Sequence, residues 1–343
     1  MGSITRLSIF VIHDDVMKWK KCLFIILSNA LFLALIELLL ARALHLIDYP
    51  RLFETDSNVG YRLRPNLDVT QRKNGIQWKV RTDSFGRRIG DDHPLSASLK
   101  PKVVLLGDSF GFGYGVESDE AVSSVLSREG FQVVNLSVPG YGTNQQLFVL
   151  QEFLEKNKAD FVITLTFSND INDIVSTYKN MRHRPAASSE FGQLNLHPFE
   201  PPWTDHLLDH SAIFALLRYG FQKPKLIKAD GYEAVTSCLI AIDQVARTHD
   251  CLPLFFLHDA NQPNFFDKML NKCRAKSLAI EDLSMALNKQ LHTILGPDKF
   301  HWNKEGHQLA GELIVSSIRR FHNEKLLPVS GSTANAPPTV ETR

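Results

Sequence analysis

The sequence predicts an α/β domain built on a parallel β-sheet and preceded by one membrane-spanning helix. From Lys102 onward, apolar runs of strand length alternate with helical patterns, an order typical of parallel sheets that carry helices on both faces. Near the N-terminus, the apolar segment 22–41 has about the length that crosses a bilayer. A polar stretch, 42–98, separates this segment from the domain.

Composition narrows the classes of function. Of 343 residues, 44% are apolar and 22% charged, an ordinary balance for a globular protein with a buried core. The net charge of +1 gives no electrostatic reason to expect a nucleic-acid partner. No C-x-x-C pair occurs, so no structural zinc site is expected among the four cysteines, which are Cys22, Cys238, Cys251 and Cys273. At most one disulfide can form among the last three, and no cofactor is expected.

The apolar segment 22–41 is interpreted as an uncleaved membrane anchor. Three lysines precede it and, by the positive-inside rule, keep residues 1–21 in the cytoplasm; they are Lys18, Lys20 and Lys21. The chain after Arg42 is then extracytoplasmic, which means periplasmic in a Gram-negative cell. Glu37 lies near the outer end of the segment, where its carboxyl group can reach the interface or become protonated.

Two alternatives to an anchor stay open at this point. The more serious one is a cleaved signal peptide, because A-R-A at 41–43 resembles a cleavage site. The apolar segment is, however, longer than the usual h-region of about 7–15 residues. The other alternative is a buried core helix, which is less favoured because the segment shows no amphipathic face.

The segment 42–98 is interpreted as an extracytoplasmic linker with a short β-rich preface to the domain. It is polar and interrupted by prolines, and it alternates in polarity around Gln77–Arg81. The dipeptide Asn74-Gly75 is a strong hairpin-turn signal.

The domain itself is assigned to residues 99–325. Continuous apolar runs predict strands that are covered on both faces, at 102–107, 131–138, 160–167 and 252–258. Helical patterns are expected at 121–128, 144–156, 232–249 and 304–321. Residues 172–230 interrupt this rhythm with prolines, among them Pro185, Pro198, Pro201 and Pro202, and some helix near 211–219, and an excursion of this size is a candidate lid. The composition of 326–343 predicts a disordered tail.

The first strand runs into V-V-L-L-G-D-S-F-G-F-G-Y-G-V at 103–116, which can be interpreted in three ways. A phosphate-binding loop is excluded because no lysine follows the glycines, and a dinucleotide fingerprint because Val116 occupies its third glycine position. The literal G-x-S-x-G match suggests an α/β-hydrolase. In that fold, however, several strands precede the nucleophile, whereas Ser109 follows the first strand. We therefore regard that match as incidental.

The third interpretation makes Ser109 a nucleophile, which requires a base to accept its proton. Far downstream, Asp298 precedes His301 by three residues, just before the last helix. A carboxylate at that spacing can accept a hydrogen bond from imidazole Nδ1, which leaves Nε2 free to face the serine.

Acyl transfer also needs an oxyanion hole. Gly140 follows the second strand and can offer its backbone N–H, and Asn169 follows the third and can offer its side-chain amide. The N–H of Ser109 is the third candidate. All three lie beyond the C-terminal ends of parallel strands, where open α/β sheets place their sites.

Taken together, these residues resemble the four ordered blocks of the SGNH/GDSL hydrolase superfamily, over about 102–321. The blocks are Gly107-Asp108-Ser109, Gly140, Asn169-Asp170 and Asp298-x-x-His301. The resemblance implies a flavodoxin-like three-layer α/β/α sandwich and serine-dependent ester hydrolysis or acyl transfer. It implies a triad of Ser109, Asp298 and His301, and an oxyanion hole formed by Ser109, Gly140 and Asn169. One departure is Phe167, where the third block usually has glycine, so we expect a bulkier entrance to the hole.

The anchor, the V-G-Y-R-L-R-P preface at 59–65 and the extended serine motif also resemble membrane-tethered bacterial members of this superfamily, which are often associated with cell-surface polysaccharide. The sequence thus predicts an SGNH-type esterase or O-acyltransferase that acts on an acyl ester, above all an acetyl ester, of a carbohydrate. Expected partners are this substrate, the membrane and polysaccharide-assembly proteins. The alternative is a non-catalytic polysaccharide-binding or assembly module that keeps the fold.

Each site residue also has a structural interpretation when it is taken alone. Ser109 could be a helix N-cap, Gly140 a turn glycine, Asn169-Asp170 a loop pair and Asp298 with His301 a surface pair. His258-Asp259 is a rival dyad, interpreted as lining the cleft or a loop.

Two further clusters carry weaker signals. A metal site from His292, His301, Glu305 and His307 is not expected, because no H-E-x-x-H is present. The segment Arg182–Arg184 is interpreted as a solvated face, or alternatively as a grip for an anionic sugar or phosphate.

Overall fold

The structure is a computed structural model that describes residues 4–46, 52–73, 75–90, 101–197, 199–219, 226–259, 261–262 and 265–326. The predicted tail lies outside these residues, apart from its first position, Leu326.

Five parallel strands form the central sheet, in the order β13-β12-β7-β5-β6. Their bounds are β5 Lys102–Leu106, β6 Gln132–Asn135, β7 Phe161–Phe167, β12 Leu252–His258 and β13 Ile280–Asp282. Numbered by appearance in the chain, the order reads 2-1-3-4-5, which is that of flavodoxin-like doubly wound sheets. The predicted fold class is confirmed, and β13 is an addition to the four expected strands.

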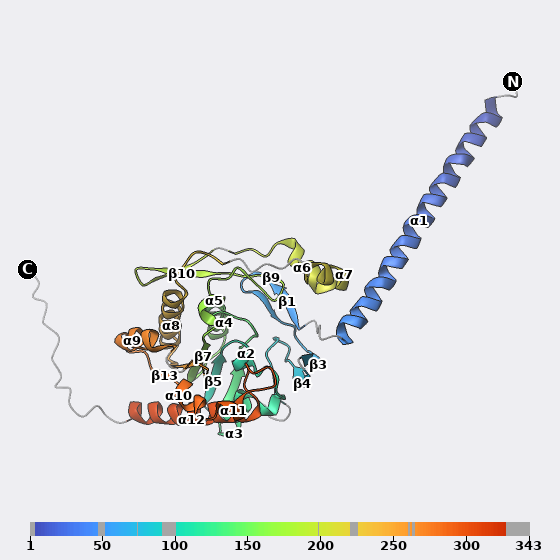
Figure 1. The fold of residues 1–343 in the computed structure, drawn as a ribbon. Coiled ribbons are helices and arrows are strands. Elements are labelled where there is room, and N and C mark those ends of the chain that lie inside the picture. Colours follow the sequence, from blue (N-terminus) through green and yellow to red (C-terminus); the bar gives the residue numbers. More distant parts are fainter. Residues whose placement is uncertain are drawn as a thin grey trace, which may run out of the picture.

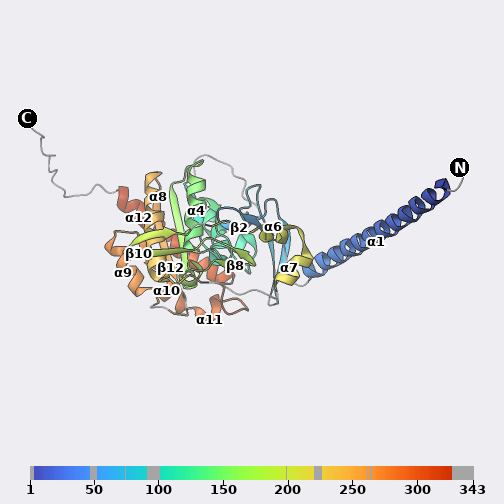
Figure 2. The ribbon, with the colours of Figure 1, turned by 90° about the horizontal axis from the view of Figure 1, so that it is seen from above.

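Helices cover both faces of the sheet and make three layers (Figures 1 and 2). On one face α3 contacts α12, and on the other α4 contacts α8. These helices span α3 Val122–Arg128, α4 Thr143–Leu154, α8 Gly231–Thr248 and α12 Lys304–Leu326. The four predicted helices are therefore present, with ends that differ from the expected ones by a few residues.

Side chains that alternate along each strand point to opposite faces of the sheet and so belong to two different hydrophobic cores. In β5, Val104 and Leu106 join the core beneath α4 and α8, whereas Val103 and Leu105 join the core beneath α3 and α12. All four side chains are fully buried. A strand buried on both faces must be apolar at every position, which explains its continuous apolar sequence.

Short helices complete the domain. They are α2 Ser109–Phe112, η1 Ser118–Glu120, α5 Asp170–Asp173, α9 Asp267–Ala275, α10 Ser284–Asn288 and α11 Leu291–Ile294. The described cysteines are all free thiols, so the one disulfide that the sequence permits is not formed among them.

The β-rich preface consists of two antiparallel hairpins, β1 Phe53–Asp56 with β2 Gly60–Leu63 and β3 Asp68–Lys73 with β4 Ile76–Arg81. Lys73 pairs with Ile76, so the predicted turn does close the second hairpin, although Asn74 lies outside the described residues. Tyr61 and Trp78 are buried in the same core as the sheet. The preface therefore packs as part of the domain surface rather than as a separate linker.

The excursion consists of hairpins and two helices. Its elements are β8 Tyr178–Lys179, β9 Arg182–His183, β10 Ala187–Glu190, β11 Gln193–Leu196, α6 Trp203–His210 and α7 Ala212–Tyr219. The helix expected near 211–219 is α7.

Helix α1, Ile4–Leu46, contains the predicted anchor and projects away from the domain (Figure 1). Its stretch Lys18–Leu40 is long and apolar enough to cross a membrane, with a mean hydropathy of 2.5, and none of it is buried within the protein. The alternative of a buried core helix is therefore wrong. A signal sequence shares this composition, so the uncleaved anchor stays a prediction.

Candidate active site

Ser109 is presented by a tight strand-to-helix turn at the carboxyl end of β5. Asp108 caps the four-residue helix α2, because its Oδ1 accepts a hydrogen bond of 2.9 Å from the Phe110 amide. Gly113 ends the helix in the left-handed region, with φ of 85°, which glycine adopts at little cost. The N-cap is thus Asp108 and not Ser109, so capping does not account for the serine.

A continuous chain of hydrogen bonds joins Ser109, His301 and Asp298. The distance from His301 Nε2 to Ser109 Oγ is 2.9 Å, and that from His301 Nδ1 to Asp298 Oδ2 is 2.7 Å. The other oxygen of Asp298 accepts hydrogen bonds of 3.0 Å from the amides of Phe300 and His301. The structure therefore brings together the three side chains that the sequence proposes as a triad, in the geometry that such a triad requires.

Asp298 is held as a carboxylate. Its partial burial raises the pKa of the carboxyl group, but hydrogen bonds from the His301 ring and from the two amides outweigh that effect and lower the pKa overall. An ionised Asp298 accepts the Nδ1–H of His301, which leaves Nε2 able to accept the serine proton.

Aromatic rings surround the imidazole of His301. The centroid of its ring lies 4.4 Å from that of Tyr114, 4.8 Å from Phe300 and 5.2 Å from Phe110. Sequence reasoning missed Tyr114 as a site residue, although its position within the glycine-rich extension of the serine motif was a usable signal. The site is recessed but open, since 17% of the His301 side chain remains exposed.

Phe167 does not stand at an open entrance. Only 5% of it is exposed, and its ring packs against Phe110, His258 and Phe300 at centroid distances of 4.5, 5.1 and 5.1 Å. The expectation of a bulkier oxyanion-hole entrance is therefore not supported. Phe167 instead supports the aromatic surroundings of the triad.

The backbone at Gly140 requires glycine. Its φ of 80° lies in the left-handed region, and a Cβ there would come within 3.1 Å of the Tyr61 hydroxyl. The preceding carbonyl, of Pro139, accepts hydrogen bonds from Tyr61 Oη at 3.2 Å and Asn180 Nδ2 at 2.8 Å. The Gly140 carbonyl accepts one of 2.5 Å from Arg184 Nη1. The preface and the excursion together fix this peptide.

Asn169 lies between two carboxylates. Its Nδ2 donates to Asp108 Oδ2 at 3.1 Å and to Asp173 Oδ2 at 2.8 Å, so both of its N–H bonds are engaged. Donation to an oxyanion would require one of these bonds to yield. The Asn169 amide is thus held between the two carboxylates.

Arg184 links Gly140 to Asp173. Its guanidinium donates to the Gly140 carbonyl, to the Asp173 carbonyl and, at 3.0 Å, to Asp173 Oδ1. Only 1% of Arg184 is exposed. The ammonium of Lys179 also contacts the Asp173 carboxylate at 2.7 Å.

The two interpretations of Arg182–Arg184 are both wrong for its arginines. Arg182, 4% exposed, is buried against Asp209 at 2.6 Å, and Arg184 is buried against Asp173. Neither guanidinium forms a solvated face or stands free to grip an anion. A run of basic residues cannot reveal buried acidic partners that are distant in sequence.

The rival dyad does not form. Asp259 Oδ1 accepts hydrogen bonds from the backbone amides of Asn261 and Gln262. The ring of His258 packs between those of Phe110 and Trp302. Burial lowers the pKa of His258 to about 3.

The four residues considered above as a metal site have different surroundings. His292 and Glu305 are exposed, while His307 is buried and its Nδ1 accepts the Val122 amide at 3.3 Å. Burial lowers the pKa of His307 to about 3. Among the described residues, no group of three acidic, histidine or cysteine side chains is arranged to hold a metal ion.

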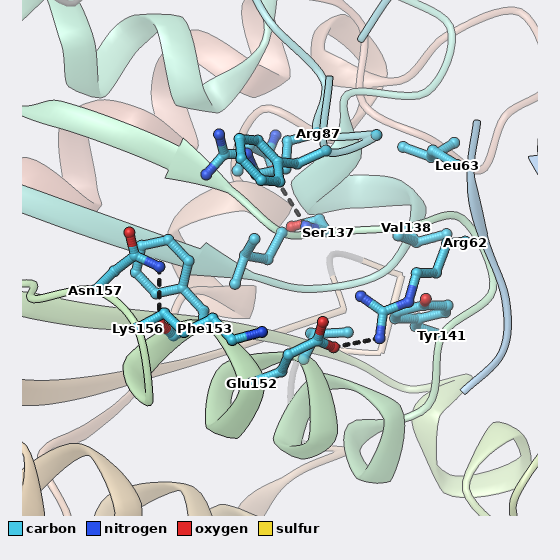
Figure 3. A pocket seen from close by; sticks show the side chains of 15 residues that line it. Arg62, Leu63, Arg87, Ser137, Val138, Tyr141, Glu152, Phe153, Lys156 and Asn157 are labelled. Atoms are coloured by element: carbon cyan, nitrogen blue, oxygen red, sulfur yellow. Dashed lines mark hydrogen bonds and ion pairs between the residues drawn. The ribbon is translucent and has the colours of Figure 1, made fainter. Parts of the chain in front are cut away.

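A separate pocket of about 250 Å³ lies between α4, the end of β6 and the preface (Figure 3). Arg62 reaches across it to Glu152, and Tyr141, Phe153 and Lys156 line it. Its lining contains none of the triad or oxyanion-hole residues, so this pocket is distinct from the candidate active site.

Comparison with family models finds no match, and comparison with curated proteins finds none either. Among solved structures, the chain is similar to a putative lipolytic protein of the G-D-S-L family from Desulfitobacterium hafniense, with 14% identity over 63% of this chain and 98% of that chain and a TM-score of 0.37. It is similar to a lipase/acylhydrolase from Enterococcus faecalis, with 16% identity over 64% of this chain and 96% of that chain and a TM-score of 0.40. It is also similar to an acetyl xylan esterase from Geobacillus stearothermophilus, with 14% identity over 66% of this chain and 97% of that chain and a TM-score of 0.37. At this level of similarity we base the function on the geometry of the site alone.

Proposed function

We propose that this chain is an SGNH-type serine hydrolase that cleaves or transfers an acyl ester. One observation carries the proposal, namely the hydrogen-bonded chain from Ser109 through His301 to Asp298. It lies at the carboxyl edge of a parallel sheet with the order 2-1-3-4-5, where sheets of this kind bind ligands.

The geometry supports a two-step reaction. Ser109 Oγ attacks the ester carbonyl while His301 Nε2 takes its proton, and the imidazolium then returns that proton to the departing alcohol. Asp298 stabilises the imidazolium, and the N–H groups of Ser109 and Gly140 receive the developing oxyanion. Water or a sugar hydroxyl resolves the acyl-enzyme, which gives hydrolysis or transfer respectively.

We further propose that α1 anchors the protein in a membrane, with residues 1–21 in the cytoplasm and the domain outside. The apolar stretch Lys18–Leu40 and the lysines that precede it support this orientation. The resemblance of the anchor, preface and serine motif to polysaccharide-associated enzymes supports an acetylated carbohydrate as the substrate. Polysaccharide-assembly proteins are the corresponding partners.

The non-catalytic alternative predicts that His301 lies far from Ser109. The 2.9 Å contact between them argues against it. A binding module has no chemical need for a carboxylate that orients an imidazole toward a serine hydroxyl.

Turnover of a chromogenic acetyl ester by the purified full-length protein tests the proposal. We expect Ser109→Ala to lower kcat by about 10⁴- to 10⁶-fold. Ser237→Ala, at a buried serine of α8, is the matched control and should keep full activity. Equal activity of the protein and Ser109→Ala would refute a serine mechanism. A panel of acetylated oligosaccharides, with and without a free sugar acceptor, then separates hydrolysis from transfer.

A further inference from the structure

We propose that α6 and α7 form a second contact with the membrane, in the bilayer interface beside the point where α1 leaves it. The inference rests on the proposed anchoring by α1 and is independent of the catalytic activity. It assigns a lipid surface as the partner of an exposed apolar patch, defined here as Trp203, Leu216 and Leu217.

Helix α7 packs on the last turns of the membrane-spanning stretch. Most side chains there are exposed, but Ile36, Glu37 and Leu40, which share one face of α1, are partly covered. That face contacts α7, and both views show α7 beside the domain-side end of α1 (Figures 1 and 2).

The depth of this contact follows from helix geometry. The stretch that can span a membrane ends at Leu40. Glu37 lies three residues earlier, which is about 4.5 Å along the helix axis at 1.5 Å per residue. A helix that packs against Glu37 therefore lies level with the edge of the hydrocarbon layer.

The contact satisfies polar groups on both sides. Glu37 accepts hydrogen bonds from Ser211 Oγ at 3.0 Å, from the Ile213 amide at 3.1 Å and from the Ala212 amide. A carboxylate within a membrane span is costly unless it has partners, and the first amides of a helix lack intrahelical acceptors. The negative charge also complements the positive end of the α7 dipole. The one acidic residue of the apolar segment thus acts as a docking point for α7.

The two helices expose large apolar side chains that suit a lipid interface. Trp203 is 72% exposed, Leu217 59% and Leu216 45%. Tryptophan concentrates at membrane interfaces, and a short amphipathic helix lies there with its apolar side chains among the acyl chains. Because α7, which carries Leu216 and Leu217, packs directly on the membrane-spanning helix, lipid is the occupant that the structure favours over a second copy of the chain.

Rigid contacts tie the patch to the domain. Arg218 of α7 contacts the buried Asp205 of α6 at 2.8 Å, and Asp209 of α6 accepts hydrogen bonds from Arg182 and from the Thr55 amide of the preface. A bilayer that holds α6 and α7 therefore fixes the orientation of the whole domain, which does not swing freely on its anchor.

Fluorescence quenching in lipid vesicles tests this inference. Full-length protein is reconstituted in phosphatidylcholine brominated either near the headgroup or near the end of the acyl chain. The Trp203 signal is the difference between the protein and its Trp203→Phe variant. Trp78 and Trp302 are buried and Trp19 lies at the start of the span, and because all three are present in both proteins their signals cancel in the difference. We expect strong quenching of Trp203 by the shallow bromines and little by the deep ones.

The double variant Leu216→Gln with Leu217→Gln should weaken the quenching of Trp203 by the shallow bromines. Phe191→Gln, at the exposed tip of the β10–β11 hairpin away from α1 (Figure 1), is the matched control and should leave it unchanged.

A Phe32→Trp substitution in the Trp203→Phe background reports separately on the anchor, as the difference between the variants with and without it, because Trp19, Trp78 and Trp302 are common to both. If the deep bromines quench Trp at position 32 while Trp203 stays unquenched, the anchor is inserted and the proposed interfacial contact is refuted. If neither is quenched, the anchoring itself fails. Concentration-dependent shielding of an unquenched Trp203 would overturn the proposal in favour of a second copy of the chain.

Discussion

At the scale of single residues, the hydrogen bond between His301 Nδ1 and Asp298 decides which imidazole nitrogen carries the proton. With Asp298 ionised, Nδ1 holds the proton and Nε2 faces Ser109 as an acceptor. The proposed chemistry depends on this tautomer, which the carboxylate selects.

The substitution Asp298→Asn should reverse the tautomer of His301. The asparagine oxygen can still accept the amides of Phe300 and His301, so its NH₂ group turns toward Nδ1 and moves the ring proton to Nε2. We expect a loss in kcat of about 10³- to 10⁴-fold, with little change in the free energy of unfolding. Acetyl-ester kinetics together with urea denaturation check both parts. Wild-type kcat in the folded variant would contradict a role for Asp298 in orienting His301.

Arg184 is expected to act as a positioning residue. Lysine in its place cannot reach Gly140 and Asp173 together, because its single ammonium lacks the planar fork of a guanidinium. Arg184→Lys should therefore lower kcat by about 10- to 100-fold while KM changes little, since the oxyanion donors act in the transition state. Steady-state kinetics give both constants.

Arg182→Lys is the matched control for that substitution. Arg182 is buried to a similar degree, but it pairs with Asp209 and contacts neither Gly140 nor Asp173. Both variants should lose stability, and only Arg184→Lys should lose kcat. Equal losses in kcat would reduce the role of Arg184 to general structural support.

At the scale of elements, the sequence pattern located β5, β7 and β12 well because these strands are buried on both faces. The strand β13 was missed because it has three residues, of which only Ile280 is apolar. Helix α9 was missed because few of its positions face the core, namely Met269, Leu270 and Cys273. Short or mostly polar elements depend on tertiary contacts that no local pattern records.

The same limit applies to the charged residues around the site. Ser109, Gly140, Asn169, Asp298 and His301 could be proposed from order and position alone. The roles of Arg184 and Asp173 could not, because a buried ion pair is visible only when both partners are placed. The docking of Glu37 on α7 joins residues 175 positions apart and was equally inaccessible.

Two buried neutral histidines, His258 and His307, pack against the ring of Trp302, and this predicts acid sensitivity. Burial lowers the pKa of each to about 3, from about 6.5 in an unfolded chain. Between these values the unfolded state binds protons that the folded state does not. Each histidine therefore lowers the free energy of unfolding by about 1.4 kcal/mol for each pH unit of acidification within this window. Their contribution to stability is complete above pH 6.5.

His258→Leu isolates one of these contributions. Asp108 and Asp170, whose pKa values are raised by burial, act with the opposite sign, so the difference between two proteins is the informative quantity. Urea denaturation from pH 4 to pH 7 should show a pH dependence that is shallower in the variant by about one proton. Parallel curves would show that His258 is protonated in the folded state.

At the scale of the whole molecule, the doubly wound sheet assembles a site from residues that are 192 positions apart, Ser109 and His301. The preface and the excursion complete it, because Tyr61 and Arg184 hold the two peptide groups around Gly140. Helix α1 projects from the same side as α6 and α7 (Figure 1). The parts added to the sheet therefore serve the site and its proposed position at a membrane.

The central claim is that Ser109 is a nucleophile activated by His301, and covalent labelling tests it most directly. Full-length protein is treated with a serine-reactive phosphonate and analysed by intact-mass and peptide mass spectrometry. We predict one adduct, located on Ser109, that forms much more slowly in His301→Ala and not at all in Ser109→Ala. An adduct that persists in Ser109→Ala, or a folded protein that never reacts, would contradict the claim.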